Sequence, residues 1–371
     1  MRSALLGLML LVAPIATAAE VDVSPALVAA DKPRWEPKGK DAQALRGQAR
    51  TKLKGKKYDD AVPMYMELMG IQPGCGVCLA ELTKALANGG HSAEALRTAA
   101  HLTTLFPELQ DSWSRQLEAA LVAREFDVAL SAVRKLQQMA PSSFEHKWTE
   151  VELLLIRGEA DAATAALESV GELKEGDVAC MRARVLYATN SPEADAVWET
   201  CEADGTEGAS DRVGGWRAIA QRDWETAALH AAQLGEAAAG DLAVAYLRME
   251  ESKPDSAVNL LNAAIKHHPE GRDLHVLHAL AAYRAGNADT AKASLEAQAA
   301  LGDAGYWVLA AAHIDWPARM ARHIAAVQAA LAADAGQDSA GVLAAAVAAH
   351  GEGPELAWIR EALAEAAPDA E

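Results

Sequence analysis

Apolar residues recur at helical spacing along most of the chain, and short polar turn segments interrupt them at nearly constant intervals. Eight of these segments end in alanine, at Ala61, Ala95, Ala129, Ala163, Ala196, Ala227, Ala257 and Ala291. The steps between these alanines are 34, 34, 34, 33, 31, 30 and 34 residues. In the first unit Ala61, Tyr65 and Leu68 share one helical face, which predicts an amphipathic helix directly after the turn.

This repeat predicts a helical hairpin in each unit, with two helices that approach closely at the recurrent alanine. Gly, Asn, Ser and Asp residues before the alanine supply the turn and the cap of the second helix. Four units carry a proline 12 residues after the alanine, namely Pro73, Pro107, Pro141 and Pro269. Proline ends a helix because it has no amide proton to donate. We therefore expect an all-α solenoid of about eight stacked hairpins.

These residues resemble a tetratricopeptide repeat array, whose pattern has Gly-x-Tyr at the turn, alanine opening the second helix and proline closing it. Tyr58, Ala61, Tyr65 and Pro73 match this pattern, and Gly55 lies in the turn one residue before the glycine position. The units from about residue 177 to 250 match less well, because their closing prolines are missing and their spacing shortens. The resemblance implies a right-handed superhelix with a concave groove lined by the first helix of each hairpin.

The two ends of the chain differ from the repeats. Residues 1–18 combine a basic start, a short apolar run and a small-residue cleavage site, which predicts a signal peptide and a periplasmic or secreted protein. Residues 19–40 are rich in proline and are expected to form an extended or disordered basic arm. The repeat array is expected to span residues 41–302, and residues 303–371 to form a C-terminal helical extension and cap.

Charge is unevenly distributed along the sequence. The formal net charge is -18, which disfavours nucleic acid as a partner. Between Lys32 and Lys57, however, ten basic residues face only Glu36 and Asp41, a local balance of 10 - 2 = +8. This segment is either a contact for an anionic partner or for lipid head groups, or a solvated surface. The apolar runs are too short or too interrupted to predict a transmembrane segment.

Motifs of enzyme chemistry do not occur in the sequence. It contains no P-loop, dinucleotide-binding fingerprint, zinc-protease motif or nucleophile elbow, so we expect no catalytic residues and no cofactor. A histidine cluster, His267, His268, His275 and His278, is the one candidate for metal binding. His275 and His278 occupy repeat positions that hold buried residues in other units, which favours core histidines over metal ligands.

Four polar side chains are candidates for binding in the groove that the resemblance implies. Arg46 and Arg50 stand at first-helix positions of the first unit, and Lys84 and Asn88 at those of the second. Such a basic and amide-bearing surface suits a carboxylate or an extended acidic peptide. The alternative is a set of solvated charges without a ligand. The asparagine and lysine pattern of the carboxylate clamp in chaperone-binding members of the family is missing.

The four cysteines are expected to form two local disulfides. A solenoid brings only adjacent units into contact, and a disulfide needs Cα atoms within about 7 Å, so Cys75 pairs with Cys78 and Cys180 with Cys201. Leu79 stands where a haem-attachment motif needs histidine, and no second ligand pair completes a zinc site. Redox activity of the Cys75 and Cys78 pair remains the alternative to a structural disulfide.

Together these patterns favour a non-enzymatic scaffold or adaptor in the cell envelope that binds a protein or peptide in its groove. The alternative is a thiol-redox or metal-handling periplasmic protein that works through Cys75 and Cys78 or the histidines. The sequence indicates no particular partner.

Overall fold

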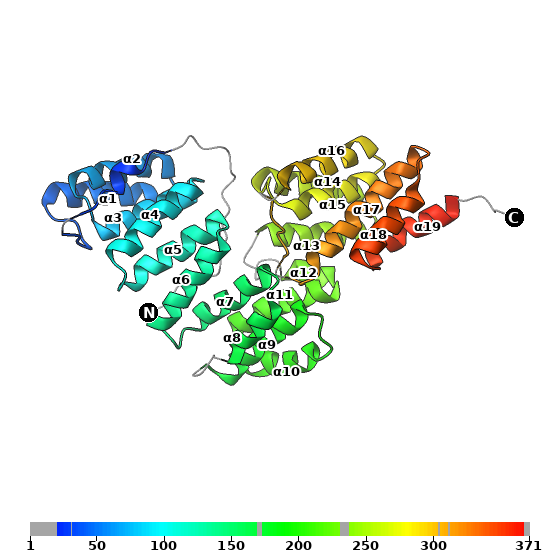
Figure 1. Ribbon diagram of the computed structural model, residues 1–371, viewed down its shortest axis with the longest axis horizontal. Helices are drawn as coiled ribbons and strands as arrows, with labels where there is room; N and C mark the ends of the chain where they lie inside the picture. Colours follow the sequence, from blue (N-terminus) through cyan, green and yellow to red (C-terminus); the bar gives the residue numbers. More distant parts are fainter. Residues whose placement is uncertain are drawn as a thin grey trace. The chain divides into compact units, whose positions relative to one another are not determined.

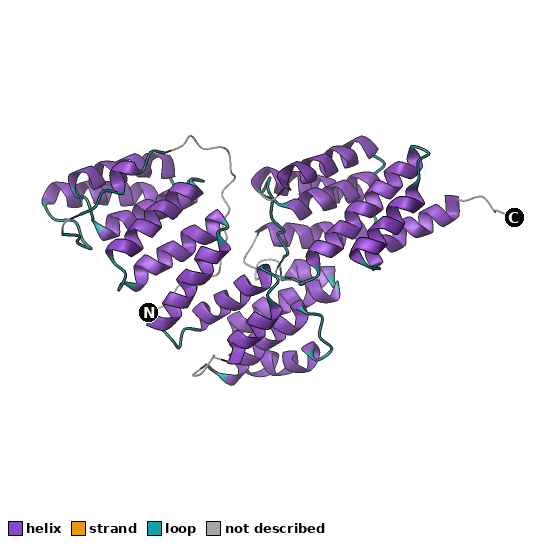
Figure 2. Ribbon diagram, viewed as in Figure 1, coloured by secondary structure: helices purple, strands orange, loops and turns teal. Residues whose placement is uncertain are grey.

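The computed structural model describes residues 21–30, 32–168, 173–230, 237–302, 305–310 and 312–366. The predicted signal peptide, residues 1–18, therefore lies outside the described residues. Throughout the described ranges the regular structure is helical, apart from two isolated β-bridges (Figure 2). The predicted all-α fold class is confirmed.

The helices follow one another as eight successive helix–turn–helix pairs in the described part of the chain, in agreement with the predicted number (Figure 1). They are α1 (Lys40–Lys54) and α2 (Tyr58–Ile71), α3 (Gly76–Asn88) and α4 (Ser92–Leu105), α5 (Gln110–Ala123) and α6 (Phe126–Met139), α7 (Phe144–Ile156) and α8 (Ala160–Glu168), α9 (Glu175–Ala188) and α10 (Ala194–Asp204), α11 (Glu207–Gln221) and α12 (Trp224–Leu229), α13 (Ala237–Glu250) and α14 (Pro254–His267), α15 (Arg272–Arg284) and α16 (Ala288–Leu301). Three further helices follow these pairs: α17 (Trp316–Asp334), α18 (Ser339–His350) and α19 (Ala357–Ala366). Two 3-10 turns, η1 (Ser24–Ala26) and η3 (Pro354–Leu356), lie near the two ends of the described chain.

The chain divides into two compact units. Unit 1 comprises Met1–Leu154 and Glu168–Leu173, and unit 2 comprises Leu155–Leu167 and Lys174–Glu371. Each unit has a large apolar core, built around residues of α2 to α5 in unit 1 and of α11 to α17 in unit 2. The predicted domain limits at residues 18, 40 and 302 stay predictions.

The recurrent alanines lie where the two helices of a hairpin meet. Seven of the eight are completely buried, namely Ala61, Ala95, Ala129, Ala163, Ala227, Ala257 and Ala291. The prediction for the fifth hairpin was wrong, because Ala196 is exposed and Ala194 is the buried alanine. Pro192 lies in the turn before it, and α10 begins at Ala194 itself. In this shortened repeat, the buried alanine therefore lies two residues before the position that the repeat alignment predicted.

The four closing prolines act as expected. In each case one residue separates the last residue of the helix from the proline. The helices end at Ile71, Leu105, Met139 and His267, and the prolines are Pro73, Pro107, Pro141 and Pro269. The intervening residues leave the helical region of backbone space, with ψ between 61° and 80°. Proline excludes the α conformation from the residue before it, so each helix ends at that point.

The C-terminal extension of unit 2 runs back across the first helices of its hairpins. At the start of α15, Tyr306 N donates to the Glu270 carbonyl (3.1 Å) and Arg272 N donates to the Tyr306 carbonyl (2.8 Å). Ile314 N then donates to the carbonyl of Ala188 at the end of α9 (2.8 Å). Helix α17 follows and packs against α15 and α18 (Figure 1). The extension therefore covers first helices of unit 2 in addition to ending the stack.

None of the helices that the structure describes is both long enough and apolar enough to cross a bilayer.

Candidate functional site

An extended segment, residues 32–39, lies along the turn between α2 and α3, and we call it the strap. Its backbone forms a parallel bridge with this turn through three hydrogen bonds: Arg34 N to the Gly74 carbonyl (3.0 Å), Gly76 N to the Arg34 carbonyl (2.8 Å) and Val77 N to the Trp35 carbonyl (2.9 Å). Since α3 has no side-chain cap, the strap carbonyls satisfy its first amides. Within the predicted arm, residues 32–39 are therefore bound to unit 1, and Ser24–Ala26 form the 3-10 turn η1.

Two glycines make room for the strap. Gly74 has a φ of +75°, and a Cβ there would lie 3.3 Å from Cα of Pro33 in the strap and 2.4 Å from the Cβ of Ala30 just before it. A Cβ at Gly76 would lie 2.4 Å from Cε3 of Trp35 and 2.8 Å from Cε2 of Phe106. The rings of Trp35 and Phe106 meet edge to face with their centroids 5.5 Å apart. Glycine at both positions therefore allows close packing of this turn against the chain that leads into α1.

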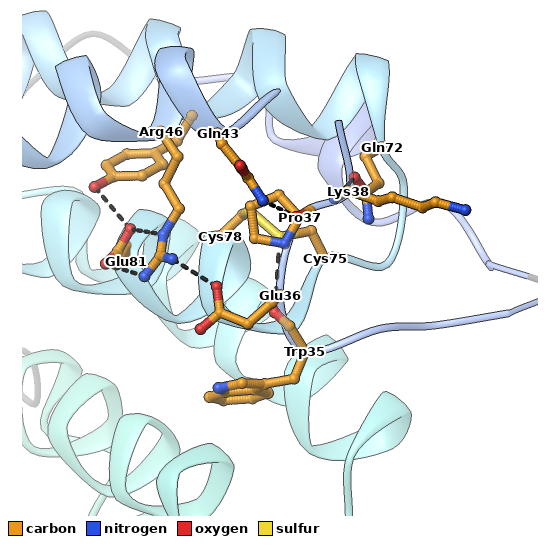
Figure 3. Close-up of a disulfide and its surroundings, with 11 residues drawn as sticks. Trp35, Glu36, Pro37, Lys38, Gln43, Arg46, Gln72, Cys75, Cys78 and Glu81 are labelled. Carbon is orange, nitrogen blue, oxygen red and sulfur yellow. Dashed lines mark hydrogen bonds and ion pairs between the residues drawn. A yellow bond between two sulfur atoms is a disulfide. The ribbon is translucent and has the colours of Figure 1, made fainter. Parts of the chain in front are cut away.

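The CxxC cysteines form a disulfide beneath the strap (Figure 3). The Cα atoms of Cys75 and Cys78 are 5.3 Å apart, and the exposed fraction of both residues is 0%. The backbone carbonyl of Trp35 lies 3.9 Å from Sγ of Cys75. Thiol exchange requires access to a sulfur atom, and the covered position of this pair withholds that access.

The second disulfide lies in unit 2, where Cys180 of α9 is bonded to Cys201 of α10. Their Cα atoms are 4.6 Å apart, and both residues are fully buried. Packing at this point is tight, since a Cβ at Gly205 would lie 2.6 Å from Sγ of Cys180. The bond links the two antiparallel helices of the hairpin whose repeat pattern is among the weakest in the sequence.

Arg46, a predicted groove residue, is neutralised within unit 1 (Figure 3). Its Nε and Nη2 donate to the Glu81 carboxylate at 3.0 and 2.9 Å, and its Nη1 donates to Glu36 at 2.7 Å. The Tyr65 hydroxyl donates to the same Glu81 carboxylate at 3.2 Å. Burial, followed by the charge of Glu81, raises the pKa of Tyr65. Arg46 therefore has two carboxylate partners within unit 1, and its role in groove binding stays a prediction.

The other three predicted groove residues face solvent to different extents. The Arg50 side chain is 55% exposed, with its Nε 3.6 Å from Glu81. Lys84 is exposed on α3, and Asn88 is half-buried near the end of the same helix. We call Arg50, Lys84 and Asn88 the first-helix surface of unit 1. Its positive charge comes from Lys84 and from Arg50, although Arg50, like Arg46, forms an ion pair with Glu81.

The basic run from Lys32 to Lys57 is split into two groups. Lys32, Arg34 and Lys38 belong to the strap and Lys40 opens α1, whereas Lys52, Lys54, Lys56 and Lys57 stand at its other end. The 15 residues of α1 place these groups about 20 Å apart. Lys52 forms an ion pair with Asp60 at 2.9 Å. The remaining two basic residues, Arg46 and Arg50, lie between these groups on α1, and of the two the side chain of Arg50 is the exposed one.

The histidine cluster does not form a metal site in the described residues. His275 Nε2 lies 2.7 Å from the Pro269 carbonyl, and His278 Nδ1 lies 2.7 Å from the Ser294 hydroxyl. Both rings are buried, as is His268, whereas His267 is exposed. Within the described ranges no three or more His, Cys, Asp or Glu side chains are arranged to hold a metal ion. Burial lowers the pKa of His278 and favours its neutral form.

Comparison with protein-family models and with curated proteins gives no match. Solved structures with a similar fold include the Cut9–Hcn1 heterotetramer of the APC/C, at 16% identity over 72% of this chain and a TM-score of 0.44. The match spans 54% of that chain, about half its length. A tetratricopeptide repeat protein from Parabacteroides merdae matches at 14% identity over 71% of this chain and 94% of its own, with a TM-score of 0.41. Yeast Tom70 matches at 12% identity over 88% and 95% of the two chains, with a TM-score of 0.33. These likenesses concern the fold.

Proposed function

We propose that this chain is a non-enzymatic scaffold or adaptor of the cell envelope that binds a protein or peptide on the first-helix surface of unit 1. The observation that carries the proposal is the exposure of that surface. Arg50 and Lys84 project from neighbouring first helices, α1 and α3, and both side chains face solvent. In a stack of helical hairpins, residues on successive first helices form one continuous surface.

The first helices of unit 2 do not offer a comparable surface, which supports placing the binding function in unit 1. The segment that contains Tyr306 and Ile314 is bonded to α15 and to the end of α9. Tyr246 of α13 stacks on Trp224 and meets the edge of Trp316 from α17. The chain's own C-terminal segment thus occupies the position that a ligand would need.

The chemistry of the first-helix surface suits an extended acidic peptide. Arg50 and Lys84 supply positive charge, and the Asn88 amide can both donate and accept hydrogen bonds. Because Arg46 is already paired with Glu81 and Glu36, the field at this surface is modest. Exposed ion pairs contribute little energy and are screened by salt, so we expect binding that weakens as ionic strength rises.

Export to an oxidising compartment is part of the proposal. It is supported by the signal-peptide pattern of residues 1–18 and by two disulfides in the described chain. N-terminal sequencing of the protein after expression in its source should give a mature end near residue 19. The redox alternative is disfavoured by the burial of both Cys75 and Cys78.

Site-specific photocrosslinking tests the binding proposal directly. A photoreactive residue at position 84 in the source cells should give an adduct with a defined partner, and Lys84→Glu should weaken isolated binding of that partner. The matched control is position 97, where Arg97 lies on the second helix α4 with a half-exposed side chain. Adducts that form at position 97 but not at position 84 would contradict the placement, and so would undiminished binding by Lys84→Glu.

A further inference from the structure

A buried ionic cluster lies in unit 2, where the C-terminal extension meets the turn after α11. Arg322 donates from Nε to Glu355 (2.8 Å), from Nη2 to Asp315 (3.1 Å) and from Nη1 to the His350 carbonyl (2.8 Å). The side chains of Arg322 and Glu355 are only 6% and 1% exposed. Arg222 Nη2 donates to the other oxygen of Glu355. All three guanidinium nitrogens of Arg322 therefore donate a hydrogen bond.

Arg319 lies in the same cluster but is poorly paired. Its side chain is 13% exposed, and its Nε is 3.9 Å from Oδ2 of Asp315. That distance is beyond hydrogen-bond range, and Arg322 already donates to the same oxygen. Burial, followed by the positive charge of Arg222, lowers the pKa of Arg319. Among the described residues, the ion pair with Asp315 is thus the closest one that Arg319 forms, and its guanidinium lies next to another cation, Arg222.

His313 adds a second donor without an acceptor. The backbone amide of Asp315 donates to Nδ1 of His313 at 3.0 Å, so Nδ1 carries the lone pair and Nε2 carries the hydrogen. The residue is 5% exposed, and within the described structure its Nε2 is buried without a hydrogen-bond partner. Burial, assisted by the charge of Arg319, lowers the pKa of His313 to about 4. Its ring is therefore neutral at pH 7 and offers one N–H donor.

The charges of the cluster do not balance. Three guanidinium groups, on Arg222, Arg319 and Arg322, face two carboxylates, on Asp315 and Glu355, which leaves 3 - 2 = +1. At the edge of the cluster lie Arg284 of α15, Glu250 of α13 and Asp223, whose charge acts on Glu250. The excess positive charge is therefore confined to the three arginines and two carboxylates named above, where a single negative charge would balance it and a dianion would be repelled by the two carboxylates already present.

We propose that Arg319, His313 and Arg222 form a binding site for a small monovalent carboxylate. The two oxygens of a carboxylate match the paired N–H groups of a guanidinium, and the His313 N–H supplies a further donor to one of them. Arg222, whose side chain is 38% exposed, and Asp315, at 43%, form the solvent edge through which the anion enters. The site belongs to unit 2 and is independent of the binding surface proposed for unit 1.

The test uses the intact protein and four small probes at constant ionic strength: acetate, acetamide, inorganic phosphate and chloride. Acetate should shift the assigned Nε–H resonance of Arg319 in a saturable manner. Acetamide has the same shape without the charge and should not, while phosphate and chloride should bind more weakly than acetate. Equal shifts with acetate and acetamide, or no saturable acetate binding, would overturn the proposal and indicate water as the natural occupant.

Variants connect the binding to these side chains. Arg319→Gln should weaken acetate binding about tenfold or more, because a charge-assisted hydrogen-bond pair is lost. Arg248→Gln on α13 is the matched control, since Arg248 pairs with Glu251 at the surface and should leave acetate affinity unchanged. Circular dichroism establishes that each variant is folded, and if Arg319→Gln does not fold, His313→Gln replaces it with several-fold weaker binding expected. Unchanged acetate affinity in a folded variant would contradict the site.

A further comparison distinguishes the source of the carboxylate. Acetate represents a free organic acid, and acetyl-aspartate amide represents the acidic side chain of a protein partner. Tighter binding of acetate assigns the site to a free acid, and tighter binding of the aspartate derivative assigns it to a protein side chain.

Discussion

The ring of Trp35 lies against the backbone of Gly76 at the start of α3. A Cβ added to Gly76 would approach Cε3 of Trp35 to 2.4 Å, a distance that real Cβ atoms do not occupy. On the same side a Cβ would also meet the Phe106 ring at 2.8 Å. Glycine at position 76 is therefore required for the strap to dock, and the strap in turn covers the disulfide between Cys75 and Cys78.

Gly76→Ala is predicted to destabilise unit 1. The new methyl group must displace Trp35 or Phe106, and overpacking of this kind typically costs about 1–3 kcal/mol. The loss should appear as a lower urea midpoint, with an unchanged dependence of the unfolding free energy on urea concentration.

The matched control for this substitution is Gly47→Ala. Gly47 lies in the interior of α1, where a Cβ would meet nothing within 4 Å. Because glycine disfavours a helix interior, this change should stabilise the protein by about 0.5–1 kcal/mol. Opposite signs for the two variants support the docking of the strap, and a neutral or stabilising Gly76→Ala refutes it.

Removal of the disulfide between Cys180 and Cys201 is predicted to cost more than removal of the shorter one. Its sequence separation is 21, against 3 for Cys75 and Cys78. On the loop-entropy estimate, the double alanine variants should lose about 3 and about 2 kcal/mol respectively. Urea unfolding measures both losses, and titration of the denatured wild type with a thiol reagent should find no free thiol. Four reactive thiols in the exported protein would contradict both bonds.

The hairpins were predictable because their determinants are local. A buried alanine such as Ala61 allows two adjacent helices to approach, and a proline such as Pro73 ends the second helix through its own backbone. The prediction failed at Ala196, where a shortened turn containing Pro192 moved the buried position to Ala194. A repeat pattern cannot locate a deletion inside a turn, because either neighbouring alanine satisfies the pattern.

The interactions that define the candidate sites were not predictable, because they join residues far apart in the sequence. Arg46 and Glu81 are separated by 35 positions, and nothing local marks them as partners. The pairing of Arg222 with Glu355 spans 133 positions. The repeat positions indicated that Arg46 lies on a first helix. They did not show that Glu81 on the next first helix, α3, faces Arg46 and binds its guanidinium.

Glu81→Gln is predicted to destabilise unit 1 more than Glu36→Gln, although both acids bind Arg46. The Glu81 side chain is 14% exposed and also accepts from Tyr65, whereas the Glu36 side chain is 64% exposed. Glu81→Gln should lower the free energy of unfolding by about 1–3 kcal/mol, and Glu36→Gln should lower it by less than about 1 kcal/mol.

Urea unfolding at low and high salt separates these two effects. The small contribution of Glu36 should decrease with salt, while that of Glu81 should largely persist, since burial limits screening. Equal costs for Glu36→Gln and Glu81→Gln would show that Glu81 is not the centre of this ion-pair group.

The stability of unit 2 is predicted to fall as the pH drops below 6.5, because two buried histidines resist protonation. Burial lowers the pKa of His313 to about 4 and that of His323 to about 3 from an ordinary value of 6.5. Between these values the unfolded chain binds more protons than the folded one, so the unfolding free energy rises with pH. Each histidine contributes about 1 kcal/mol per pH unit in this window.

Urea unfolding between pH 5 and 7, in buffers without carboxylate, measures this dependence. His313→Gln should reduce the slope, and the double substitution with His323→Gln should reduce it further, while the lowered pKa of His278 accounts for part of what remains. His323 Nε2 lies 3.2 Å from the Tyr246 hydroxyl, so glutamine retains a polar partner for that group. A His313→Gln variant that keeps the full wild-type slope would mean that the ring of His313 becomes protonated in the folded protein.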